Sequence, residues 1–115
     1  LVVVVISKEK FNQLVNYLIG VGGQPVSNLI VNGSKENIKH IKIEGIDIES
    51  QKEFRVLTTD YLTKGGDNMN FFLNPIEVIY TNKKLRDVII NHCIEANSKG
   101  EKISSQLDNR IIINE

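Results

Sequence analysis

The sequence contains few residues that could stabilise a small domain by means other than its hydrophobic core. It contains one cysteine, Cys93, so no internal disulfide can form, and it contains no tryptophan. Its 14 Lys and Arg residues are balanced by 14 Asp and Glu residues. Because no net charge attracts a polyanion or an anionic lipid surface, we expect neither nucleic acid nor a membrane as a partner.

Long apolar runs are also missing. The apolar opening, residues 1–6, is far shorter than the roughly 20 residues that cross a bilayer, and no basic segment precedes it as in a signal peptide. The composition, 41% hydrophobic and 24% charged over 115 residues, is that of one folded domain. Since the apolar run typical of a strand already includes Leu1, we expect the domain to continue upstream.

Hydrophobic periodicity predicts an α/β or mixed α+β fold, a layered sandwich of a mixed β-sheet with helices. Residues 1–6 are typical of a strand covered on both faces or of one deep in a sheet. Ser7 is expected to cap a helix over residues 8–19. The inward stripe of that helix is Phe11, Leu14, Val15, Leu18 and Ile19. Further strands are expected at residues 26–31 (ending before Asn32 and Gly33), 38–43, 46–48, 54–59, 76–80 and 109–114.

A second helix is expected to run from an N-cap at Thr81 to about Asn97. Lys99 and Gly100 would end it. Its inward stripe would consist of Leu85, Val88, Ile89, His92 and Cys93.

The histidines and the cysteine do not form a pattern that binds metal. His40 and His92 are far apart, and neither has Asp, His or Cys at ligand spacing. Cys93 directly follows His92 and points elsewhere on a helix that turns about 100° per residue. We therefore expect no metal, no cofactor and no catalytic residue in this chain. The basic cluster at residues 83–86 is expected to be solvated surface.

The formation of a hydrophobic core does not explain the composition of residues 60–68, DYLTKGGDN. Gly65 and Gly66 allow a sharp bend with close approach of a ligand, and the bend would bring Asp67 near Tyr61. A carboxylate accepts both hydrogen bonds of a vicinal diol such as a ribose, and a tyrosine ring stacks on a planar base, so a nucleoside fits both groups. Alternatively, the segment is an ordinary turn in which Asp67 bonds its own backbone and Tyr61 is a boundary core residue.

Residues 54–67, FRVLTTDYLTKGGD, resemble a known signature. The signature is Y-x-V-x-x-x-x-[FY]-L-A-x-G-G-D-G of the C-terminal domain of 5′-nucleotidases, the family that includes UDP-sugar hydrolase and ecto-5′-nucleotidase. Residues 1–6 and the following helix are similar to the family's N-x-L-V-V-V-x-L-x-G-x-x-L-x-x-x-L stretch, and residues 22–29 to its G-x-F-L-Q-V-S-G-L stretch. Residues 84–87 and the last strand resemble the end of that domain. The resemblance implies a single domain over residues 1–115.

The resemblance implies the substrate-binding domain of a hydrolase of nucleotide catabolism. In the family, a separate calcineurin-like metallophosphatase domain holds two divalent metal ions and hydrolyses the phosphoester, so this chain alone is not expected to be active. That domain would be joined in cis or be a separate chain. Tyr61 matches the ring that stacks on the base of a nucleotide or nucleoside, and Asp67 matches the aspartate that binds the ribose hydroxyls. Gly65 and Gly66 shape the turn, and Asn68 stands where the family usually has glycine.

The resemblance also suggests export to the periplasm or cell surface, where family members are often found. Two departures from the family concern the pocket. The family's second stacking aromatic falls near Gly23, so Phe71, Phe72 or another chain would have to supply it. The family's upstream N-x-G-x-x-R segment, which contributes substrate ligands, is not among the 115 residues. Alternatively, the domain has kept the fold, lost the ligand and serves as a structural or interaction module.

Overall fold

The chain folds as an α+β domain with two β-sheets, in agreement with its periodicity. The computed structural model describes residues 1–34, 36 and 38–114. The strands are β1 (Val2–Ser7), β2 (Leu29–Gly33), β3 (Ile38–Ile43), β4 (Ile46–Asp47), β5 (Glu53–Thr58), β6 (Glu77–Tyr80) and β7 (Ile111–Ile113). The helices are α1 (Lys8–Gly20), α2 (Asp60–Thr63) and α3 (Leu85–Ser98), with short 3₁₀ turns η1 (Gly66–Asn68) and η2 (Asn70–Phe72).

Strand β1 lies in the middle of the smaller sheet, whose order is β5-β1-β6, and pairs antiparallel with both neighbours. Val2, Val4 and Ile6 point into the core and are at most 2% exposed. A β-branched run is stable in such a position because its side chains pack on a pleated surface that has a neighbour on each side. The prediction of a strand deep in a sheet at the start of the chain is therefore confirmed.

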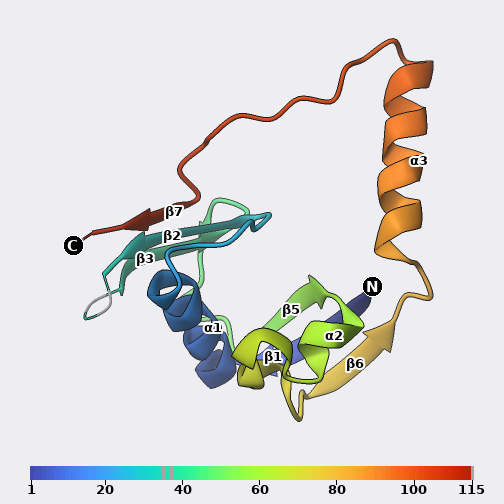
Figure 1. The fold of residues 1–115 in the computed structure, drawn as a ribbon. Helices are drawn as coiled ribbons and strands as arrows, with labels where there is room; N and C mark the ends of the chain where they lie inside the picture. The colour runs from blue at the N-terminus through green and yellow to red at the C-terminus, as the bar shows by residue number, and fades with distance from the viewer. Residues whose placement is uncertain (35, 37, 115) are drawn as a thin grey trace.

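Helix α1 follows directly and lies between the two sheets (Figure 1). The Ser7 hydroxyl accepts a hydrogen bond from the Lys10 N–H at 3.3 Å, which confirms the expected N-cap. The expected inward stripe is also confirmed, since Phe11, Leu14, Val15, Leu18 and Ile19 are all buried. The Phe11 ring stacks on Phe54 of β5 with ring centroids 4.0 Å apart, and this contact joins α1 to the sheet.

The larger sheet has the order β4-β3-β2-β7. Strand β2 begins at Leu29, later than predicted, because Asn28 adopts a left-handed φ of 63° that strand backbone does not allow. It also continues through Asn32 and Gly33, where the sequence predicted a break and the structure has only a shift of register. Strand β7 returns from the C-terminal part of the chain and pairs in parallel with β2.

Helix α3 departs from the sequence prediction in two ways. Its N-cap is Lys84, because the Thr81 hydroxyl donates to the Leu1 carbonyl at 2.7 Å instead of capping the helix. The expected inward stripe is wrong, since all five of its residues are exposed: Leu85, Val88, Ile89, His92 and Cys93.

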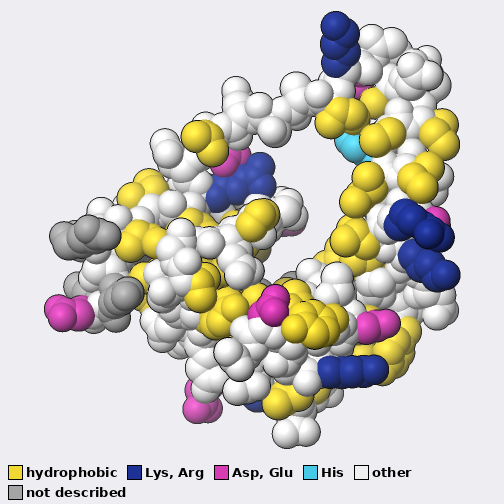
Figure 2. Space-filling model, viewed as in Figure 1, with side chains coloured by type: hydrophobic (Ala, Val, Ile, Leu, Met, Phe, Trp, Pro, Cys, Tyr) yellow, Lys and Arg dark blue, Asp and Glu magenta, His cyan; other side chains and the backbone are white. Residues whose placement is uncertain are grey.

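Figure 1 shows α3 standing away from both sheets, and Figure 2 shows hydrophobic side chains uncovered along it. Periodicity identifies the face of a helix that would pack, but it does not supply the surface that would receive it. None of the helices in the described part of the chain is long and apolar enough to span a membrane.

The burial pattern predicts different losses of stability for one core substitution and one surface substitution. Phe54→Ala should lower the free energy of unfolding by about 3–5 kcal/mol, because it removes a ring that is 1% exposed. Ile94→Ala is the matched control on α3, where the side chain is 62% exposed, and should change stability by less than about 0.5 kcal/mol. Urea unfolding followed by circular dichroism measures both. An equal loss in the two variants would mean that α3 is packed in solution.

Candidate functional site

The candidate site lies in the connection between β5 and β6, the two outer strands of the smaller sheet. One turn of helix, α2, follows β5, and the turns η1 and η2 lead on toward β6. Met69, Phe71 and Phe72 are buried and hold the second half of this connection in the core. The C-terminal end of the bend is thereby held in place.

The bend is left-handed at three of its residues. Gly65, Asp67 and Asn68 have φ values of 88°, 54° and 60°. Glycine adopts this conformation without steric conflict, and Asp and Asn are the side chains that tolerate it best. The double glycine therefore produces a sharp turn as predicted, and the turn directs the chain back toward Tyr61.

Gly66 is required for a reason that the sequence did not indicate. A Cβ atom at this position would lie 2.5 Å from Cε1 of the Tyr61 ring and 2.6 Å from the Tyr61 carbonyl oxygen. Both distances are too short for real carbon contacts. The close approach that Gly66 permits is therefore to the tyrosine of its own chain.

Tyr61 and Asp67 meet at the surface. The Tyr61 hydroxyl donates to Oδ1 of Asp67 at 3.2 Å, the Tyr61 side chain is 63% exposed, and Asp67 is exposed. Tyr61 is thus not a boundary core residue, and the Asp67 carboxylate bonds to a side chain where the ordinary-turn interpretation expected its own backbone. The arrangement offers a ring face and a carboxylate to solvent side by side.

Tyr17 of α1 also belongs to this site, and sequence reasoning missed it. Its hydroxyl donates to the Asp67 carbonyl at 2.8 Å, and its ring packs edge-on against Phe71 with centroids 5.6 Å apart. The available signal was a tyrosine at the border of the apolar stripe, because a half-buried phenol needs a hydrogen-bond partner. The identity of that partner depends on the tertiary fold.

The second aromatic ring expected of a base sandwich is not supplied by the residues considered for it. Phe71 and Phe72 are 5% and 2% exposed, so neither ring face is available to a ligand. At Gly23, a Cβ atom would meet only the Ile111 side chain, at 3.8 Å. Tyr61 is therefore the ring that this bend presents.

An apolar groove of about 520 Å³ borders the bend. Tyr17, Leu62 and Met69 line it, but Tyr61 and Asp67 are not among its lining residues. The ring and the acid thus lie on open surface next to the groove. A ligand held by these two groups would remain largely solvated.

Within residues 1–34, 36 and 38–114, no three His, Cys, Asp or Glu side chains converge in a way that could hold a metal ion. Cys93 is exposed, as is the basic cluster that contains Lys83, Lys84 and Arg86. No protein-family model, curated protein or solved structure matches the chain.

The contact between Gly66 and Tyr61 generates a prediction. Gly66→Ala should displace the Tyr61 ring, break its bond to Asp67 and destabilise the fold by about 1–3 kcal/mol. Gly20→Ala is the control: its added methyl meets nothing within 4 Å, and replacing a helical glycine should raise stability by about 0.5–1 kcal/mol. Tyrosine ring shifts in NMR spectra report the displacement. Unchanged Tyr61 shifts in Gly66→Ala would contradict the described packing.

Proposed function

We propose that the chain is the nucleoside-binding or nucleotide-binding domain of a 5′-nucleotidase-like phosphoester hydrolase. The observation that supports this most directly is the exposed Tyr61 ring, held beside the Asp67 carboxylate by a hydrogen bond across the glycine bend. These are the two residues that the 5′-nucleotidase signature assigns to the base and to the ribose. In this proposal, hydrolysis belongs to a calcineurin-like metallophosphatase domain with its own divalent metals.

The geometry of the bend suits a ribose diol. Oδ1 of Asp67 already accepts one hydrogen bond from Tyr61, but a carboxylate has about four acceptor positions, so the diol can still donate to it. The same bond fixes the position of the ring relative to the acid. A base attached to a ribose on Asp67 would therefore meet a preorganised ring, which reduces the entropy lost on binding.

The expected affinity is low. One stacking contact contributes about 1–3 kcal/mol and charge-assisted hydrogen bonds about as much again. Together they approach the roughly 4 kcal/mol that corresponds to a millimolar dissociation constant. The exposure of both side chains agrees with this expectation, because an open site leaves the ligand in competition with water.

A second candidate function is a structural or interaction module that has lost the ligand. Two observations favour it: Gly23 has no side chain where a second ring is expected, and Phe71 and Phe72 are buried. The upstream reading frame of the gene separates the candidates. A calcineurin-like sequence with D-x-H and G-N-H-[DE] motifs supports the hydrolase, whereas an unrelated neighbour supports the module.

Ligand titration tests the proposed site. Adenosine should bind with a dissociation constant of about 1 mM, and Tyr61→Ala or Asp67→Asn should each weaken binding about tenfold. Tyr80→Ala is the matched control, because Tyr80 is also an exposed tyrosine, at 70%, but lies on β6. Binding is followed by NMR shift changes in the full chain.

A ligand that lacks the ribose diol tests whether Asp67 binds that diol. Dideoxyadenosine should bind the parent chain about as weakly as adenosine binds Asp67→Asn, and Asp67→Asn should not distinguish the two ligands. Equal adenosine affinity in the parent chain, Tyr61→Ala and Asp67→Asn would remove this site assignment. Absence of saturable binding would favour the interaction module.

A further inference from the structure

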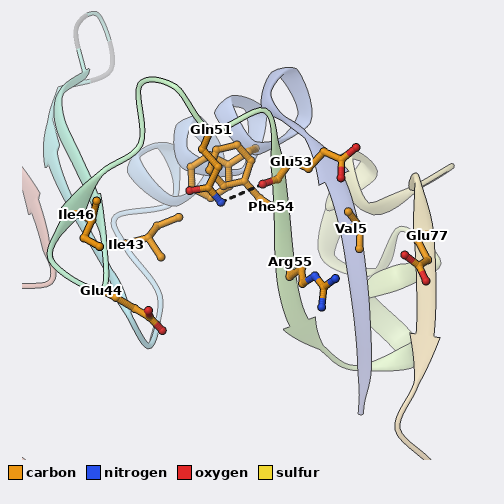
Figure 3. Close-up of a pocket in the computed structure, with 10 residues that line it drawn as sticks. Val5, Ile43, Glu44, Ile46, Gln51, Glu53, Phe54, Arg55 and Glu77 are labelled. Atoms are coloured by element: carbon orange, nitrogen blue, oxygen red, sulfur yellow. Dashed lines mark hydrogen bonds between the residues drawn. The ribbon is translucent and has the colours of Figure 1, made fainter.

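Strand β5 is one of the two outer strands of its sheet, and a groove runs along its free side. The first part of the groove, about 500 Å³, lies between the start of β5 and the turn that joins β3 to β4. Figure 3 shows Ile43, Glu44 and Ile46 across this gap from Glu53 and Phe54. The second part is the apolar groove of about 520 Å³ described above, which continues along residues 55–58.

The direction of the backbone groups in β5 follows from the hydrogen bonds at both ends of the sheet. The Lys8 N–H donates to the Lys52 carbonyl at 3.0 Å, and the Ile76 N–H donates to the Val5 carbonyl at 2.8 Å. Because backbone polar groups alternate in direction along a strand, residues 54, 56 and 58 bond to β1, and residues 53, 55 and 57 point into the groove.

One of the outward groups already has a partner, which confirms this direction. The Gln51 side-chain amide donates to the Glu53 carbonyl at 3.0 Å (Figure 3). In the described part of the chain, no group bonds the outward N–H and C=O of Arg55 and Leu57. Two consecutive outward positions therefore present free donors and acceptors beside an apolar groove, which is the requirement for adding a strand.

The charge of the groove selects among extended peptides. Glu44 and Glu53 line the groove at the free side of β5, against one cation, Arg55, whereas Glu77 lies on β6 at the opposite edge of the sheet. Ile43, Ile46 and Phe54 contribute apolar side chains to the lining. A strand with apolar residues on one face and a basic residue at one end is complementary to this lining, whereas a phosphorylated ligand would be repelled by the two carboxylates.

We propose that this groove binds an extended segment of a partner protein, which adds a strand to the free edge of β5 and places a lysine or arginine near Glu44 and Glu53. Main-chain bonds to Arg55 and Leu57 supply the affinity, and the carboxylates supply the preference for a basic residue. The inference does not depend on the nucleoside site, because none of the residues named here belongs to the bend.

The test titrates the full chain with an acetylated and amidated peptide of sequence lysine-valine-threonine-valine-threonine-valine, followed by NMR. We expect saturable shift changes at Arg55 and Leu57. Methylating alternate backbone nitrogens on the bonding edge of the peptide, or replacing its lysine by glutamate, should each weaken binding about tenfold. Equal binding of the parent peptide, the methylated peptide and the glutamate peptide would overturn the proposal.

Variants of the protein, in place of variants of the peptide, test the same edge of β5. Leu57→Pro removes an outward N–H without touching the bonds to β1 and should weaken peptide binding about tenfold, whereas Leu57→Ala keeps the N–H and should bind within about threefold of the parent chain. If Leu57→Pro fails to fold, the methylated peptide decides. A dimer of the parent chain that Leu57→Pro abolishes would assign the edge to a second copy and overturn the partner-peptide proposal.

Discussion

Strand β1 pairs with a neighbour on each side, and this double pairing determines where the rest of the chain lies. Because β5 and β6 occupy opposite edges of β1, the segment between them has to cross the sheet. It crosses on the core face, where Met69, Phe71 and Phe72 are buried, and reaches Tyr17 on α1. The glycine bend is therefore positioned by the order of the strands as much as by its own residues.

The sequence predicted several local features well, although the N-cap expected at Thr81 lies at Lys84. Ser7 caps α1, the stripe of α1 is buried, and the double glycine makes a left-handed bend, because each depends on neighbours a few residues away. The prediction failed at α3, whose apolar residues repeat with helical spacing and yet are exposed. Periodicity reports what a helix could bury, whereas its burial depends on the rest of the fold.

The contacts of the candidate site likewise divide into those that the sequence predicted and those that it did not. The sequence brought Tyr61 and Asp67 together because both flank one short turn. It could not indicate that Gly66 makes room for the Tyr61 ring, or that Tyr17 holds the Asp67 carbonyl, since both contacts require the folded chain. The two proposed sites also differ in charge preference. The bend offers a ring and one carboxylate to a neutral nucleoside, whereas the β5 groove has an excess of carboxylates that favours a cation.

The parallel pairing of β2 with β7 affects the order in which the two sheets can fold during synthesis. Val31 pairs with Ile111, so β2 can form this pairing only after one of the last segments of the chain has been synthesised. Until that segment leaves the ribosome, β2 has an unprotected edge, while the smaller sheet can already assemble from residues up to Tyr80. Contacts between such distant positions form slowly, and completion of the larger sheet is therefore the step at which folding and self-association compete.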